Sequence, residues 1–213
     1  MKTQSNHPMT HPVDGHQWTD YYQAVEGRPP RETLLTALTK FDAETTFGTL
    51  RFAVDLGCGD GRDTVELLRR GWQVLAIDGE AQAIDRLLSR SDINPQLLET
   101  RVERFEELVL PENVDLINAS FCLQFCPPAD FPAFWQKIVA AIREEGRFCG
   151  HLIGDRDSWA TYDHMNHHTR EQVLELLAPF DIEHLEEEEH PGKTAIGVEK
   201  YWHLFHIVAR KIA

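Results

Sequence analysis

The chain has 213 residues, of which 42% are hydrophobic, and this is enough for one domain with a sizeable core. Its formal net charge of -14 at pH 7 repels phosphate groups, so we expect neither nucleic acids nor anionic membranes as partners. Four cysteines are spread along the chain and are expected to be reduced thiols, and no secretory leader or membrane-spanning run is visible, so we expect a cytoplasmic protein.

The first residues of the chain predict a tail followed by two helices. Residues 1–17 are polar and are expected to form a mobile N-terminal segment. Helices are predicted at Trp18 to Glu26 and at Arg31 to Phe41, because Gly-Arg-Pro-Pro interrupts the helical pattern between them. We expect these helices to form an N-terminal helical cap over residues 18–45.

Residues 51–213 alternate short apolar runs with helical stretches, which predicts βαβ units and a parallel sheet. This sheet core and the cap together form a single expected domain, residues 18–213. The first five strands are predicted at Phe52 to Leu56, Gln73 to Ile77, Leu97 to Val102, Val114 to Ala119 and Arg147 to Leu152.

Two later helices have clear start signals. The helix before the fifth strand is expected to run from about Pro128 to Glu145, because proline is tolerated in a first turn and Gly146 ends the pattern. Another helix is predicted to start near Thr169, where Thr169 and Gln172 match a capping box.

The C-terminal part predicts two final strands, Phe180 to Glu187 and Val198 to Lys211, joined through the turn-like residues 190–193. Consecutive strands with a short link pair antiparallel. The acidic run 186–189 is interpreted as a solvated edge or loop.

The most informative motif follows the first strand. Gly57, Gly59 and Gly61 alternate there, and glycine permits positive φ and a close approach of backbone to a ligand. Arg62 stands where a dinucleotide-binding loop has its third glycine, which disfavours NAD and FAD. Asp78 ends the second strand, where a carboxylate can accept hydrogen bonds from ribose hydroxyls, although alone it could equally be a helix cap.

These motifs resemble those of the class I S-adenosylmethionine-dependent methyltransferases, through residues 54–61, Asp78 and residues 114–119. In detail the chain looks like the small bacterial type similar to tellurite-resistance methyltransferases. The resemblance implies an α/β, Rossmann-like fold with a seven-stranded, mostly parallel sheet whose strand seven is antiparallel. It also implies S-adenosyl-L-methionine as the cofactor, bound across the carboxyl ends of the first, second and fourth strands.

The resemblance further implies the residues of the cofactor site. Asp55 and Gly57 are expected to face the methionine portion, and the residues after the fourth strand to line the sulfonium side. Near the adenine, Arg104 and Phe105 follow the third strand, with Glu103 as an alternative contact. The full expected cofactor-binding set is Arg28, Asp55, Gly57, Cys58, Gly59, Gly61, Asp78, Gly79, Arg104, Phe105, Asn118, Ala119, Ser120 and Phe121.

Two arginines could clamp the methionine carboxylate from the stiff segment around Pro29-Pro30. Arg28 and Arg31 flank this segment, and Arg28 is the favoured one. The alternative for Arg28 is an ordinary surface arginine.

Methyl transfer from a sulfonium leaves a neutral thioether, so positioning can supply most of the catalysis and a general base is needed only for a protonated acceptor. His151 and His203 are the candidate bases, and Trp202 is expected to face the acceptor. Asp155 and the histidines at 164, 167 and 168 are further candidates. No metal site is expected, because an adjacent histidine pair rarely converges on one ion.

The sequence therefore predicts in-line methyl transfer to a small-molecule acceptor by a monomer or homodimer. The alternative is a non-catalytic S-adenosylmethionine-binding sensor or assembly protein. A site filled by Phe121, Trp159 or Trp202 would favour the sensor, whereas an open pocket beside the methyl group would favour an enzyme. A macromolecular acceptor would require a basic recognition face that the sequence does not indicate.

Overall fold

The computed structural model describes residues 15–44 and 50–212. Residues 1–14 of the expected mobile segment lie outside the described residues. Residues 15–17 are the first of helix α1 (Gly15–Val25), which starts three residues before the predicted position.

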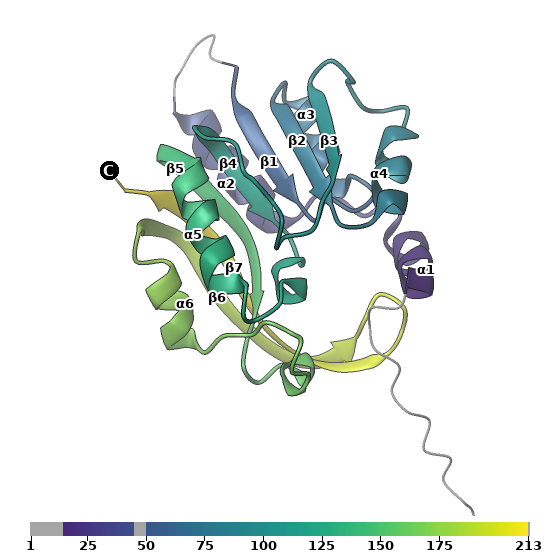
Figure 1. The fold of residues 1–213 in the computed structure, drawn as a ribbon, viewed down its shortest axis with the longest axis vertical. Helices are drawn as coiled ribbons and strands as arrows, with labels where there is room; N and C mark the ends of the chain where they lie inside the picture. The colour runs from purple at the N-terminus through teal and green to yellow at the C-terminus, as the bar shows by residue number, and fades with distance from the viewer. Residues whose placement is uncertain (1–14, 45–49, 213) are drawn as a thin grey trace, which may run out of the picture.

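The centre of the molecule is a seven-stranded sheet in the order β3-β2-β1-β4-β5-β7-β6. Strands β1 to β5 are parallel, and β7 pairs antiparallel with both β5 and β6. The predicted mixed sheet with an antiparallel strand seven is therefore confirmed (Figure 1). Its strands are β1 (Phe52–Leu56), β2 (Gln73–Asp78), β3 (Leu98–Val102), β4 (Val114–Ala119), β5 (Ile142–Ile153), β6 (Phe180–Lys193) and β7 (Glu199–Lys211).

Helices cover both faces of this sheet. Helices α2 (Glu32–Ala43), α3 (Arg62–Arg69) and α4 (Ala81–Leu88) pack on one face through one apolar cluster. Helices α5 (Phe131–Ala141) and α6 (Arg170–Leu176) pack on the other face through a second cluster. Because β1, β2 and β4 are buried on both faces, they are nearly continuous apolar runs, as parallel strands require.

The two N-terminal helices have different positions. Leu34, Leu38 and Phe41 of α2 are fully buried in the core, so α2 is a layer of the fold. Helix α1 lies beside α4 and the far end of the β6–β7 hairpin (Figure 1). Only α1 is therefore placed as a cap.

The helix before β5 is shorter than predicted. Helix α5 ends at Ala141, and Ile142 already pairs with Val114 of β4. Lys211, at the end of β7, donates to the carbonyl oxygens of Val139 (2.7 Å) and Ile142 (2.6 Å). These bonds satisfy carbonyl groups at the C-terminal end of α5 from a distant part of the chain. No local sequence signal therefore marks where the helix ends.

The turn of the last hairpin also differs from the prediction. Residues 190–193 continue β6 up to the pair Lys193 and Glu199, and the turn is at 194–198, where Gly197 has a φ of 85°. Pro191 is tolerated because β6 is an edge strand, where one face of the backbone needs no partner. The acidic run 186–189 lies on this edge strand, which agrees with the predicted edge position.

The predicted start of α6 is confirmed. Thr169 accepts from the backbone of Gln172, and the Gln172 side chain accepts from the backbone of Thr169, which is a complete capping box. A short 3-10 helix, η1 (Leu123–Phe125), follows β4, and a second, η2 (Ser158–Thr161), follows β5.

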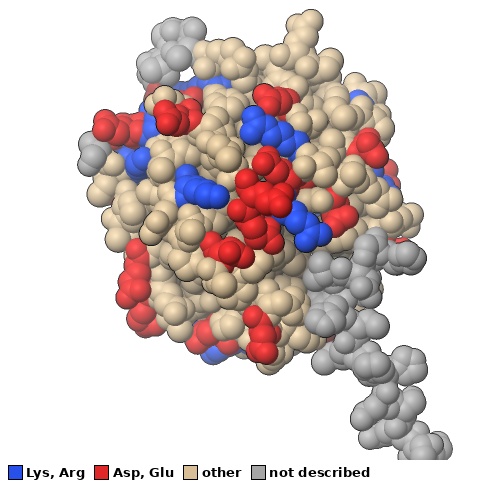
Figure 2. Space-filling view, in the orientation of Figure 1, with Lys and Arg blue, Asp and Glu red and all other residues tan. Residues whose placement is uncertain are grey.

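The surface is mixed in charge. On the face in Figure 2, lysine and arginine side chains form small separate groups among aspartate and glutamate. None of the described helices combines the length and apolar character needed to cross a membrane.

Candidate active site

A cavity of about 220 Å³ opens at the carboxyl ends of β1, β2, β3 and β4. Here the strand order reverses, because β1 has β2 on one side and β4 on the other. Ligands of open parallel sheets bind at such a switch point. We call this the cofactor cavity, because the predicted cofactor-binding loops meet in it.

The glycine loop forms the floor of the cofactor cavity, and its glycines have different roles. Gly57, Gly59 and Gly61 all have positive φ, at 62°, 56° and 86°. A Cβ on Gly57 would collide with the Cβ of Cys122, so glycine lets the loops after β1 and β4 touch. Gly59 lines the cavity below Tyr22.

Gly61 does not line the cofactor cavity, contrary to prediction. It is the N-cap of α3, and a Cβ there would collide with Leu87 of α4. Its role in this fold is the close packing of two helices. Cys58 and Gly79 do line the cavity, as predicted.

Asp78 lies at the end of β2 with its carboxylate at the cavity wall. Its two oxygens accept from the backbone N–H groups of Gly59 and Glu80, each at 2.9 Å. These bonds fix the carboxylate beside the glycine loop, and each oxygen keeps a further lone pair for a ligand. Burial raises the pKa of Asp78.

A buried acidic network lies at the end of β1. Asp55 accepts from Thr64 (2.5 Å) and from the side-chain amide of Asn118 (2.8 Å), and the same amide donates to Asp63 (3.1 Å). Burial, and then the charge of Asp63, raise the pKa of Asp55. Asp55 and Asp63 both line the cavity, so two carboxyl groups are available to a cationic ligand group.

Two arginines face this acidic network, and neither is the favoured Arg28. Arg31 and Arg62 line the cofactor cavity, and no carboxylate of the described residues forms an ion pair with either. The Arg62 Nε donates to the carbonyl oxygen of Pro29, while its Nη1 is buried without a partner among the described residues. Arg28 is exposed, bonds to the carbonyl oxygen of Ala24, and lies outside this cavity.

The loop after β3 closes the opposite side. Glu103, Arg104 and Phe105 line the cavity there, as predicted. Phe105 also packs on Phe134 of α5, with ring centroids 5.1 Å apart, so it is both a wall and part of the core. Ile77 adds an apolar side chain from β2.

The loop after β4 contributes only part of its predicted set. Ser120 and Phe121 line the cavity, but Asn118 and Ala119 are fully buried between the neighbouring strands. Asn118 acts indirectly, through its bonds to the two carboxyl groups. Phe121 has a φ of 55°, which is unusual for a bulky residue, and Arg31 lies over its ring at 4.3 Å.

His151 does not reach the cofactor cavity, contrary to its predicted role as a base. Its ring is buried behind Phe121, with the two rings stacked 4.0 Å apart. Burial, and then nearby His206, hold its pKa well below the ordinary value. Because Phe121 covers this ring and His151 lines neither this cavity nor the one next to it, the imidazole has no contact through which to take a proton from a substrate there.

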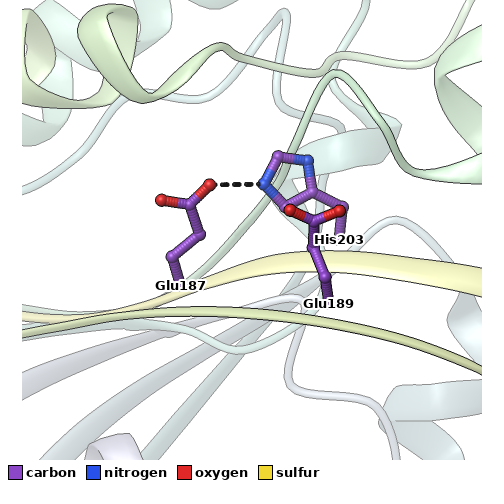
Figure 3. A group of neighbouring side chains, drawn as sticks. All are labelled: Glu187, Glu189 and His203. Carbon is purple, nitrogen blue, oxygen red and sulfur yellow. Dashed lines mark hydrogen bonds and ion pairs between the residues drawn. The ribbon is translucent and has the colours of Figure 1, made fainter.

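His203 does not line the cofactor cavity either. It is fully buried, its Nδ1 accepts from the backbone N–H of Arg156 (3.1 Å), and its Nε2 lies 3.0 Å from Glu187. Figure 3 shows the imidazole and the carboxylate of Glu187 facing each other. The start of β7 lies at the expected end of the sheet. The His203 side chain nevertheless points to the face of the sheet opposite the one expected.

Glu187, Glu189 and His203 are the group among the described residues that could bring three ligand atoms to one metal ion. The Arg156 guanidinium already contacts all three, at 2.8 Å from Glu187 and 3.2 Å from the His203 ring. An arginine thus supplies the positive charge that balances this cluster.

The other candidate bases lie elsewhere. His168 is buried against Phe131, and burial lowers its pKa to about 4. His164 and His167 line neither the cofactor cavity nor the cavity next to it. The four cysteines are free and buried, and burial raises the pKa of each thiol, which agrees with the prediction of reduced packing residues.

Residues 53–146, which carry this glycine loop and the strands around it, match the family model described as a methyltransferase domain. This segment, less than half of the chain, is similar to methyltransferase domains. The predicted resemblance to methyltransferases is therefore confirmed for this segment.

Among curated proteins, the chain is similar to carboxy-S-adenosyl-L-methionine synthase of Vibrio cholerae, at 32% identity over 101 residues. The match covers 43% of this chain and 39% of the relative, so it spans about two fifths of the relative's length.

Solved structures share the fold. TehB from Haemophilus influenzae superposes with a TM-score of 0.72 at 16% identity, covering 91% of this chain and 67% of that one. The 1,6-didemethyltoxoflavin-N1-methyltransferase of Burkholderia thailandensis, solved with its substrate and S-adenosylhomocysteine, has a TM-score of 0.59 at 21% identity and covers 92% and 85% of the two chains.

A second cavity, of about 490 Å³, lies directly beside the cofactor cavity. Trp202 lines this cavity, as expected of a residue facing the acceptor, but the cavity as a whole has no sequence signal, because its walls come from α1, η1, η2 and the β6–β7 hairpin. The residues that line both cavities are Trp18, Tyr21, Val25, Arg31, Phe121 and Phe125.

Proposed function

We propose that the protein transfers a methyl group from S-adenosylmethionine to a small-molecule acceptor by in-line displacement. The observation that supports this most is the second cavity, which shares six lining residues with the cofactor cavity. An acceptor in the second cavity would meet the cofactor along the shared wall of Phe121 and Arg31.

The cofactor cavity fits S-adenosylmethionine in charge and shape. Asp78 would hold the ribose hydroxyls, and Phe105 would pack on the adenine. At the other end, Arg31 and Arg62 would hold the carboxylate of the methionine portion, and the unpartnered Nη1 of Arg62 is a donor that such a carboxylate would satisfy. Asp55 would face the ammonium group.

The bound cofactor supplies a methyl group on a positively charged sulfur. As the acceptor's lone pair forms a bond to the methyl carbon, the carbon–sulfur bond breaks and sulfur keeps its electron pair. Any proton on the acceptor leaves to water. The protein's contribution is to hold the two reactants in line, which is worth about 7 to 11 kcal/mol in well-oriented reactions.

No general base is part of this proposal. His151 is screened by Phe121, and His203 is bound in its cluster on the other side of the sheet. No aspartate or glutamate of the described residues lines the second cavity, and the histidine that does, His190, is paired with Glu188 (3.0 Å). The reaction therefore suits an acceptor that reacts through an anion or a neutral lone pair.

The alternative of a non-catalytic sensor receives less support. In a sensor, Phe121, Trp159 or Trp202 would fill the space beside the methyl group, but all three line an open cavity. A nucleic-acid acceptor is disfavoured by the net charge of -14 and by the scattered basic groups in Figure 2.

The Asp78→Ala substitution tests the cofactor part of the proposal. We expect S-adenosylhomocysteine to bind about tenfold more weakly or worse by calorimetry, because two hydroxyl contacts to a fixed carboxylate are lost. Asp85→Ala, an exposed acid on α4, is the matched control and should retain full affinity.

A methyl-transfer screen across metabolite classes tests the catalytic part. Formation of S-adenosylhomocysteine that depends on an acceptor, and that falls in the Asp78→Ala variant, is the expected result. Unchanged affinity in that variant would remove Asp78 from the ribose role, and tight cofactor binding without any transfer would favour the sensor.

A further inference from the structure

The second cavity has walls rich in aromatic rings. Trp159 lies 6.1 Å from Trp202 and 6.2 Å from Phe125, and Trp202 lies 6.4 Å from Phe121, all between ring centroids. These separations are typical of interacting aromatic pairs. A flat ring entering this space would find aromatic surface on several sides.

The tryptophans are held in place from behind. Lys200 is buried, with its ammonium 3.9 Å from the Trp159 ring centre and 4.5 Å from that of Trp202. It forms an ion pair with the buried Asp157, which also accepts from the backbone N–H of Trp159 (2.9 Å). These contacts fix the position of both rings in the wall of the cavity.

One polar group in the wall lacks a partner. Gln124 of η1 is only 3% exposed, and its Nε2 donates to the carbonyl oxygen of Phe121 at 2.7 Å. This bond fixes the orientation of the amide, and it leaves the buried Oε1 without a hydrogen-bond donor among the described residues. A buried acceptor without a partner costs about 1 to 3 kcal/mol, which a ligand O–H or N–H would recover.

The cavity is basic although the protein is acidic. Arg28, Arg31 and Lys193 line it, whereas no acidic side chain of the described ranges 15–44 and 50–212 does. Arg31 serves the cofactor side, and Lys193 pairs with Glu199 at the surface (3.0 Å). Arg28, at the exposed mouth, has no carboxylate partner in the part of the chain that the structure describes.

We propose that the second cavity binds a flat aromatic acceptor with two polar ends. A hydroxyl or amino group at the buried end donates to the Gln124 Oε1, and a carboxylate at the mouth binds the Arg28 guanidinium. The substrate class is hydroxy- or amino-substituted aromatic carboxylates, and this inference rests on the proposed methyl-transfer function.

The methyl group goes to the oxygen or nitrogen at Gln124, because Gln124 is bonded to Phe121 in the shared wall. The heteroatom's lone pair forms the new bond to carbon, and the carbon–sulfur bond breaks. The proton of the acceptor passes to water, since an amide oxygen accepts a hydrogen bond but does not take up the proton.

Binding of simple probes to the protein saturated with S-adenosylhomocysteine tests the inference. The probes are para-hydroxybenzoate, its amide, which lacks the charge, and benzoate, which lacks the donor. We expect para-hydroxybenzoate to bind about tenfold more tightly than either analogue, by calorimetry or tryptophan fluorescence.

Two variants assign the contacts. Arg28→Gln should remove the preference for the acid over the amide, and Gln124→Met should remove the preference for the hydroxyl probe over benzoate. Arg69→Gln, which removes an exposed arginine of α3, is the matched charge control and should keep both preferences. S-adenosylhomocysteine affinity in each variant shows whether the fold and the cofactor cavity are intact.

Equal binding of acid and amide, no binding of para-hydroxybenzoate, or preferences that survive both substitutions would overturn the inference. Loss of the probe when S-adenosylhomocysteine is added would also overturn it, because the probe would then sit in the cofactor cavity. If the proposed function itself is wrong, the cofactor analogue binds but no acceptor of any class is methylated, so the two failures are distinguishable.

Discussion

The carboxyl group of Asp55 is buried at the end of β1, where burial and then the charge of Asp63 raise its pKa to about 7. An unfolded aspartate has a pKa of about 3.9, so the folded chain holds an extra proton between these two values. The contribution of this group to stability therefore falls as the pH rises from about 4 to about 7. A cationic ligand group beside Asp55 lowers this raised pKa, because it favours the ionised carboxylate.

We predict that S-adenosylhomocysteine binds more tightly as the pH rises through about 7, with release of protons from the protein. The reason is that the ligand ammonium lowers the raised pKa of Asp55. Calorimetry in buffers of different ionisation enthalpy counts the released protons. Asp55→Asn should bind more weakly with a flatter pH profile, and an unchanged profile in this variant would exclude Asp55 as the source.

Individual residues of the site were predictable to different degrees. Asp78 and the glycine loop follow from chain order, because parallel strands bring their carboxyl ends together. The choice between Arg28 and Arg31 could not be made from sequence, since it depends on how the segment before α2 packs on α3. The bond from the Arg31 backbone N–H to Asp63 (2.9 Å), which joins residues 32 positions apart, holds Arg31 at the cofactor cavity.

At the scale of elements, η2 and β7 are joined by the ion pair of Lys200 and Asp157. Both side chains are buried, and Asp157 also accepts from the backbone N–H of His203 (3.1 Å). Removing one member of a buried pair leaves the other charge uncompensated.

We predict that Lys200→Met lowers the free energy of unfolding in urea by about 3 kcal/mol. The double variant with Asp157→Asn should lose less than the sum of the two single variants, because no lone charge remains. S-adenosylhomocysteine affinity should change little, since Lys200 lines neither cavity. Lys40→Met, at an exposed position of α2, is the control, and additive losses would contradict a coupled pair.

Element boundaries were predictable where local signals decide them. Strands β1 and β4 match the predicted limits, and the start of α6 has a complete capping box. The end of α5 and the hairpin turn differ because long-range contacts decide them: Lys211 closes α5, and strand pairing extends β6 through Pro191. The second cavity is unpredictable for the same reason, as four distant elements form it.

The whole molecule is strongly acidic, and this matters before any contact forms. A net charge of -14 attracts cations and repels anions over about a Debye length, roughly 8 Å at physiological salt. S-adenosylmethionine has one more positive charge than S-adenosylhomocysteine, so the negative charge of the protein attracts the substrate more strongly than the product.

We predict that the association rate constant of S-adenosylmethionine exceeds that of S-adenosylhomocysteine at low salt, because of this long-range attraction. The ratio should fall towards one as NaCl rises from about 20 to about 300 mM. Stopped-flow tryptophan fluorescence measures both rates. A ratio that does not depend on salt would show that the global charge has no part in cofactor capture.

The six side chains that line both cavities have a thermodynamic consequence. When one occupant shifts Phe121 or Arg31, the free energy of binding the other occupant changes, and linkage requires the two changes to be equal. An acceptor that raises the affinity for S-adenosylmethionine therefore binds more tightly itself when S-adenosylmethionine is already bound. The same reciprocity holds for the demethylated product and the acceptor, since each changes the affinity of the protein for the other by the same factor.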